Sequence, residues 1–86
     1  MKTIQYTIQD PMGIHARPAG MLAKEAGKYA CNITVAVEDG NPVDAKRIMG
    51  VMRLAAKQGM QLNMTFDGAD EDTAAAAFEA FLKENL

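Results

Sequence analysis

Apolar and polar positions alternate in several short segments of the chain, which is typical of strands that are covered on one face. Ile4, Tyr6 and Ile8 alternate with polar residues over 3–8, and the same period recurs over 33–37 and 60–66. Residues 38–41 provide turn residues before a short run at 42–45, which predicts a hairpin. Four strands are therefore expected.

Three further segments have the spacing of helices. A helix is predicted over 16–28, a second over 47–57 that is closed by Gly59, and a third from Asp70 with acidic residues in its first turn. The inward positions of the first and third are expected to be Ala19, Leu22, Ala23, Ala26, Ala74, Phe78, Phe81 and Leu82. This order predicts one α+β domain over residues 1–86, in which helices cover one face of an antiparallel sheet and water covers the other.

Composition narrows the classes of function. A chain of 86 residues should carry its chemistry on the surface rather than in a deep cavity. Without an apolar run long enough for a signal peptide or a membrane span, we expect a cytoplasmic protein that does not insert into a membrane. The only histidine and the only cysteine, Cys31, cannot build a zinc site, so neither a metal nor a cofactor is expected.

The charge of the chain is unevenly distributed. Eight of the nine Lys and Arg residues lie in 1–66, whereas six of the eleven Asp and Glu residues lie in 67–86. The body is therefore mildly basic and the tail acidic. Because no Lys and Arg stripe with interleaved aromatics accompanies this imbalance, nucleic acid is not an expected partner.

His15 stands at the predicted start of the first helix, in the segment Gly-Ile-His-Ala-Arg-Pro-Ala of residues 13–19. If His15 is the N-cap, the amides of Ala16 and Arg17 lack intrahelical partners, and Pro18 is tolerated in the first turn. Free amides, the helix dipole and one guanidinium beside an imidazole make an anion site suited to a phosphoryl group. The same positive surroundings predict a pKa of His15 below its ordinary value of about 6.5, which leaves a neutral nucleophile at pH 7. The alternative is a surface histidine that only caps the helix.

The second predicted helix is apolar over an arc of about 220°, whereas a stripe that faces a core needs somewhat more than about 100°. Some of its apolar side chains should therefore face solvent, as on a surface that docks on other proteins. The alternative is that all of them pack internally.

Two motifs resemble the histidine-containing phosphocarrier family HPr over the full length of the chain. Residues 13–19 match its Gly-(Ile/Leu)-His-x-Arg-Pro-Ala motif, and residues 45–52, Ala-Lys-Arg-Ile-Met-Gly-Val-Met, are similar to its Ala-Lys-Ser-(Ile/Leu)-Met-Gly-(Val/Leu)-Met. The resemblance implies an open-faced sandwich of four antiparallel strands and three helices. It also implies a phosphoryl carrier of the bacterial phosphotransferase system rather than a stand-alone enzyme. His15 Nδ1 would take the group from enzyme I, which phosphoenolpyruvate charges, Arg17 would assist, and sugar-specific acceptor proteins would receive it.

The resemblance also divides the second helix by role, in a protein expected to be a monomer. It assigns three residues to partner docking (Ile48, Met49, Met52) and three to the core (Val51, Leu54, Ala55). A basic rim that speeds encounter with acidic partners would comprise Lys24, Lys28, Arg47 and Arg53.

Two positions depart from the family pattern. Arg47 replaces the serine that a regulatory kinase phosphorylates in Gram-positive relatives, so regulation through that serine is not expected. Met12 stands where many relatives have a small polar residue, so one helper hydrogen bond of the family is not expected.

Two other functions compete with the carrier. One is an HPr-like regulatory binding protein without a transport role, against which the presence of both His15 and Arg17 argues. The other is a small module that binds nucleic acid or a metabolite. The solvent face of the predicted sheet is rich in Thr and Gln rather than aromatic residues, so it offers few platforms for base stacking.

Overall fold

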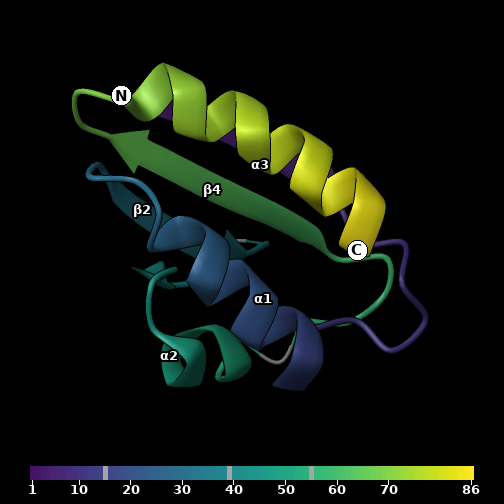
Figure 1. Cartoon of the computed structure of the whole chain (residues 1–86). Helices are drawn as coiled ribbons and strands as arrows, with labels where there is room; N and C mark the ends of the chain where they lie inside the picture. The colour runs from purple at the N-terminus through teal and green to yellow at the C-terminus, as the bar shows by residue number, and fades with distance from the viewer. Residues whose placement is uncertain (15, 39, 55) are drawn as a thin grey trace.

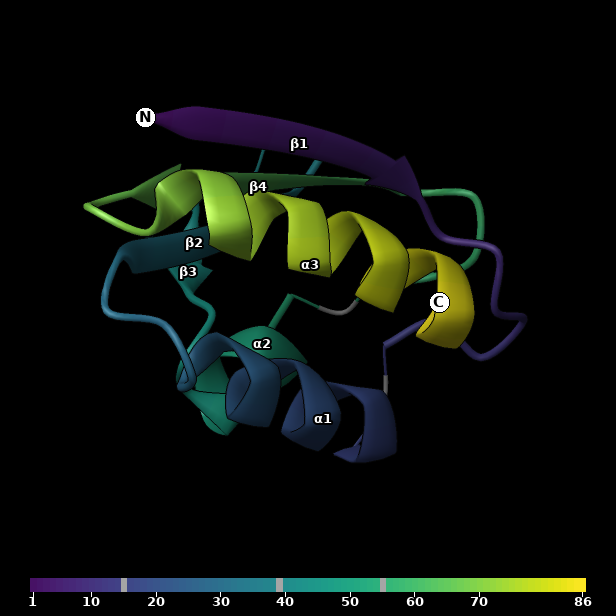
Figure 2. The same cartoon turned by 45° about the horizontal axis from the view of Figure 1, so that its top comes forward.

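The computed structural model describes residues 1–14, 16–38, 40–54 and 56–86 (Figure 1). Its elements are, in order, β1 (Lys2–Thr7), α1 (Ala16–Ala26), β2 (Asn32–Val37), β3 (Val43–Asp44), α2 (Ile48–Met52), β4 (Gln61–Asp67) and α3 (Glu71–Asn85). All three helices lie on one side of a single sheet (Figure 2). The predicted α+β open-faced sandwich is confirmed.

The four strands pair in the order β1-β4-β2-β3, and every pair is antiparallel. The expected hairpin is present, because β3 pairs with β2 through Val43 and Asp44. On the face away from the helices, Thr3 lies beside Thr65 and Thr65 beside Thr34. This open face is therefore polar, and Asp44 and Asp67 also lie on it.

The core lies between the sheet and the helices. Leu62, Met64 and Phe66 of β4 are fully buried, and the ring of Phe66 lies 5.5 Å from that of Phe78 on α3. From α1, Ala19, Leu22, Ala23 and Ala26 are buried as predicted. The buried rows of β2 and β4, with the half-buried Ile4 and Tyr6 of β1, thus form the side of the sheet that the helices cover.

The second helix is shorter than predicted. It was expected over 47–57, but α2 ends at Met52, and a turn follows at 53–54. The Ala56 carbonyl accepts a hydrogen bond from the amide of Ile14, a partner 42 residues away in the chain. Gly59, expected to close this helix, instead donates to the Ile8 carbonyl in the turn before β4. Contacts distant in sequence therefore override the local helical pattern here.

Other boundaries move by one or two residues. β1 covers 2–7 rather than 3–8, although Ile8 remains buried, and α1 ends at Ala26 rather than near Lys28. At the end of α1, the amides of Lys28 and Tyr29 bond three residues back, which tightens the last turn.

Asp70 precedes α3, but its side chain does not cap that helix. Its carboxylate accepts hydrogen bonds from the amides of Ala30, at 2.8 Å, and Cys31, at 2.9 Å. These bonds, chiefly that from Ala30, lower the pKa of Asp70 below its ordinary value. Burial, and secondarily Asp70, raises the pKa of the Cys31 thiol, which fits a packed structural residue. Asp70 thus fastens the start of β2 to the start of α3.

Candidate functional site

His15 lies outside the residues that the structure describes, so the site is built from the segments on either side of it. The first segment runs from β1 to Ile14, and the second begins with Ala16, the first residue of α1. The predicted start of the first helix is confirmed. The predictions for the imidazole itself, including its pKa, remain predictions.

Two sets of hydrogen bonds hold the loop before the site, one within the loop and one to the segment that follows α2. Within the loop, the amide of Met12 donates to the Asp10 carboxylate at 2.9 Å, and that of Gly13 donates to the Asp10 carbonyl at 2.9 Å. The next amide, of Ile14, donates to the Ala56 carbonyl at 3.0 Å. Gly13 has φ +64°, and a Cβ there would lie 2.3 Å from the Ala56 oxygen, so only glycine fits this approach.

The first turn of α1 presents positive charge to solvent. Ala16 and Arg17 are exposed, whereas Pro18 and Ala19 are buried and anchor the helix. No acidic residue occupies this turn to offset the helix dipole. Among the described residues, neither the amides of Ala16 and Arg17 nor the Arg17 guanidinium has a hydrogen-bond or ion-pair partner. This end of α1 can therefore receive an anion through two amides and one guanidinium.

A hollow of about 360 Å³ lies beside this turn. It is lined by Asp10, Met12, Arg17, Pro18, Met21, Glu84 and Asn85. The hollow joins the loop before α1 to the end of α3, where the Leu86 oxygen accepts hydrogen bonds from the amides of Gln9 and Asp10. Two carboxylates share the hollow with Arg17, so an anion bound there is held less tightly than by an isolated guanidinium.

Comparison with known proteins assigns the family. Residues 2–84 match the family described as "PTS HPr component phosphorylation site". The chain belongs to the HPr family. It is 46% identical over 84 residues to the phosphocarrier protein HPr of Lysinibacillus sphaericus, covering 98% of this chain and 94% of the relative. With that of Mycoplasma genitalium it shares 40% identity over 85 residues, which cover 99% and 97% of the two chains.

Solved structures of HPr proteins agree with this assignment. HPr-C-His from Thermoanaerobacter tengcongensis superposes with a TM-score of 0.91 at 34% identity, covering 99% of this chain and 94% of that one. The chain is accordingly a phosphocarrier protein of the phosphotransferase system and not a stand-alone catalyst. Its family match spans both motifs found in the sequence.

The three residues predicted for partner docking, Ile48, Met49 and Met52, are exposed on α2 as expected for this HPr protein. Val51 is fully buried and Leu54, in the turn after α2, is half-buried, while Ala55 lies outside the described residues. The docking role of the three exposed residues remains a prediction. In Figures 1 and 2, α2 lies beside α1. We call Ile48, Met49 and Met52 the α2 patch.

The predicted basic rim is exposed, but two of its members already face carboxylates. Lys28 pairs with Glu25 at 3.0 Å, and Arg47 with Asp44 at 3.6 Å. The remaining members, Lys24 and Arg53, are exposed. Because exposed pairs are weak, all four cations can still contribute to a long-range field.

Met21 was not predicted from the sequence as part of the site, although its spacing from Arg17 indicates a shared helix face. It is four residues after Arg17 on α1, so the two side chains lie on one face of the helix and reach the same hollow. The sequence pattern also gave no sign that α3 contributes to this hollow. Among the described residues, no group of three His, Cys, Asp or Glu side chains could hold a metal ion, and no helix is long and apolar enough to cross a membrane.

Proposed function

We propose that His15 is the residue of this phosphocarrier that accepts the phosphoryl group from phospho-enzyme I and passes it to sugar-specific acceptor proteins. The observation that carries the proposal is the first turn of α1. It begins directly after His15, contains no acidic residue and presents Arg17 to solvent. An anion formed on His15 would lie at the positive end of a helix.

Transfer needs both stabilisation and release. A neutral imidazole nitrogen, Nδ1 by family resemblance, forms the new bond to phosphorus as the bond to the donor breaks. Arg17 and the amides of Ala16 and Arg17 then neutralise the phosphoryl oxygens. Each additional 1.4 kcal/mol of stabilisation would shift the transfer equilibrium about tenfold toward the bound group. Asp10 and Glu84 in the adjoining hollow oppose such trapping.

Docking is assigned to the α2 patch with Lys24, Lys28, Arg47 and Arg53 around it. Exposed methionines adapt to several partners, and a basic rim favours approach by acidic proteins. In this proposal residues 1–86 form one HPr-like domain that acts as a monomer in the cytoplasm. Arg47 offers no hydroxyl, so the carrier would not be controlled by phosphorylation at that position.

A reconstituted relay tests this function. Enzyme I, labelled phosphoenolpyruvate, this protein and a sugar-specific acceptor are combined, and label on the acceptor is followed with time. Label should reach the acceptor only when the carrier is present, and His15→Ala should abolish transfer while retaining the far-UV circular dichroism of the fold. Transfer by a folded His15→Ala protein would refute the assignment.

The same relay separates the carrier from a regulatory binding protein. A regulator without a transport role would bind its target but leave the acceptor unlabelled. Gel filtration at several protein concentrations tests the proposed monomer, since an elution position that moves with concentration would reveal self-association. A solved structure from T. tengcongensis, 34% identical to this chain, is described as an HPr dimer. The measurement therefore distinguishes a monomer from a dimer of that kind.

A further inference from the structure

Methionine dominates the exposed apolar surface of this protein. Met is usually among the most buried side chains, as Met64 is here at 0% exposure. In contrast, the amino-terminal Met1 is 76% exposed, and four methionines within the chain are exposed as well: Met12 at 72%, Met49 at 64%, Met52 at 40% and Met21 at 39%. Among the described residues, Ile48 is the only exposed large hydrophobic side chain that is not methionine.

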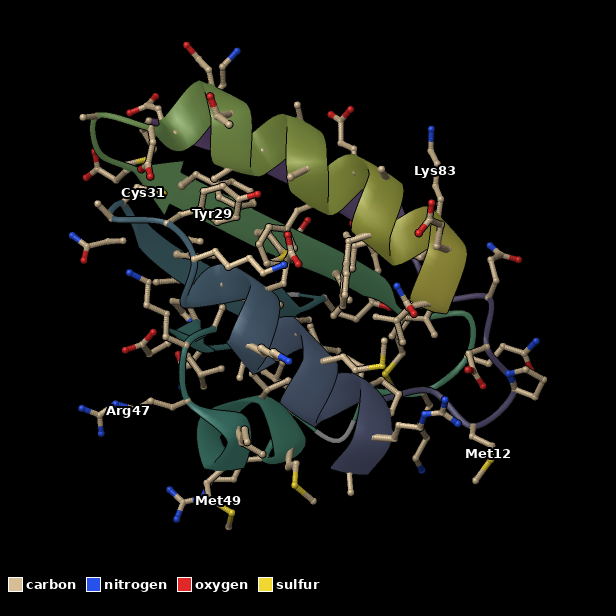
Figure 3. All side chains as sticks on the ribbon, in the orientation of Figure 1. Met12, Tyr29, Cys31, Arg47, Met49 and Lys83 are labelled. Carbon is tan, nitrogen blue, oxygen red and sulfur yellow. The ribbon has the colours of Figure 1, made fainter. Side chains whose placement is uncertain are left out.

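These methionines border both functional surfaces. Met12 and Met21 line the hollow that also contains Arg17, and Met49 and Met52 belong to the α2 patch. Figure 3 shows Met12 on the loop before α1 and Met49 on α2, with both side chains directed away from the body of the protein. Thioether sulfur is therefore accessible beside the phosphoryl site and on the docking surface.

We propose that Met12, Met21, Met49 and Met52 are sulfoxidation sites through which hydroperoxides switch off the carrier. Hydrogen peroxide transfers one oxygen atom to each sulfur. The sulfur loses two electrons, the O–O bond breaks, and water leaves. The product is methionine sulfoxide, which methionine sulfoxide reductases convert back to methionine. The consequence for transfer rests on the proposed function, whereas the order of oxidation does not.

Sulfoxidation should act differently at the two surfaces. On the α2 patch it replaces a flexible apolar side chain with a polar one, so partner proteins must cover a strongly hydrated group. In the hollow, the new oxygen of Met12 or Met21 is an acceptor near the five N–H donors of Arg17. It would compete with the phosphoryl oxygens for that guanidinium. The first effect raises the KM of enzyme I for the carrier, and the second lowers kcat.

The test begins with the order of oxidation. The whole protein is treated with graded hydrogen peroxide, and peptide mapping by mass spectrometry follows each methionine. Met12, Met21, Met49 and Met52 should be oxidised well before Met64. Oxidation of Met64 at the same rate as these four would overturn the assignment of the sites.

Phosphorylation by enzyme I and phosphoenolpyruvate then measures the consequence. Initial rates of treated protein at low carrier concentration should fall about tenfold, equivalent to a loss of about 1.4 kcal/mol. Methionine sulfoxide reductase should restore them. The double variants Met49→Leu/Met52→Leu and Met12→Leu/Met21→Leu are each compared with and without peroxide. With the first double variant, peroxide should no longer raise the KM of enzyme I for the carrier. With the second, it should no longer lower kcat.

Met60→Leu is the matched control, because Met60 is half-buried and lies in neither surface. It should remain as sensitive to peroxide as the unaltered protein. Unchanged rates for protein oxidised at all four sites would overturn the switch. Untreated protein that enzyme I fails to phosphorylate would instead refute the proposed function, while the mapped order of oxidation would still decide the sites.

Discussion

Alanine at Gly13 and at Gly20 should change stability in opposite directions, although the chemical change is the same. Gly13 has φ +64°, where a residue with a Cβ costs about 1–2 kcal/mol. Its Cβ would also lie 2.3 Å from the Ala56 oxygen and 2.8 Å from Lys57 Cα. Both of these are backbone atoms, so one chain segment must move.

That movement disturbs the hydrogen bond from the Ile14 amide to the Ala56 carbonyl, a bond of 3.0 Å that contributes about 1 kcal/mol. Gly13→Ala should therefore lower the free energy of unfolding by about 2–3 kcal/mol. Gly20 lies inside α1, and a Cβ there meets nothing within 4 Å. Gly20→Ala should raise the free energy of unfolding by up to about 1 kcal/mol through helix propensity.

Urea unfolding followed by far-UV circular dichroism measures both variants. The midpoints should move apart while the m-values stay equal, and the melting temperature of Gly13→Ala should fall by about 10–20 °C. A Gly13→Ala protein as stable as the unaltered one would refute the close approach of the loop to Ala56. The same result would also show that this contact does not position the residues before α1.

Three further predictions concern the Asp70 carboxylate, the Arg17 guanidinium and phosphorylation at position 47. The lowered pKa of Asp70 contributes stability above its ordinary value of 3.8, which is lost as the pH falls through the lowered pKa. Asp70→Asn should therefore destabilise the fold at pH 7 more than Asp72→Asn, and the deficit should shrink in acid; equal pH profiles from denaturant titrations would contradict this. Arg17→Ala should slow phosphorylation by enzyme I about ten- to hundredfold, as expected for the loss of a charge-assisted hydrogen bond, and Lys83→Ala should leave the rate unchanged; equal stopped-flow or quench-flow rates for both variants would refute a role for Arg17. An ATP-dependent HPr kinase should leave the protein unlabelled because Arg47 replaces the regulatory serine, and acid-stable phosphate on a serine or threonine would overturn that expectation.

Local periodicity predicted the parts of the fold whose burial is set within one element. Leu62, Met64 and Phe66 point inward because strand side chains alternate, and Phe78 is buried because α3 has one apolar stripe. The start of α1 was also predictable, because Pro18 is accepted only in a first turn of a helix. These features depend on neighbours close in the chain.

Features that depend on contacts between residues far apart in the chain could not be predicted from the local sequence pattern. The Ala56 carbonyl bonds to Ile14 instead of extending α2, and the Asp70 carboxylate binds amides about 40 residues earlier. The hollow around Arg17 is built from a loop, α1 and the end of α3, so no single segment encodes it. Met21 alone could have been found, by its spacing of four residues from Arg17.

Mass spectrometry of the phosphorylated protein shows on which residue, and through which kind of bond, the phosphoryl group is carried. The protein is incubated with phosphoenolpyruvate and enzyme I, and intact-mass and peptide mass spectra are recorded after acid and after alkali treatment. We expect one phosphoryl group per chain, on the peptide that contains His15. It should be lost in acid, retained in alkali and missing from His15→Ala. No added group, or a group on another residue that survives acid, would contradict this expectation.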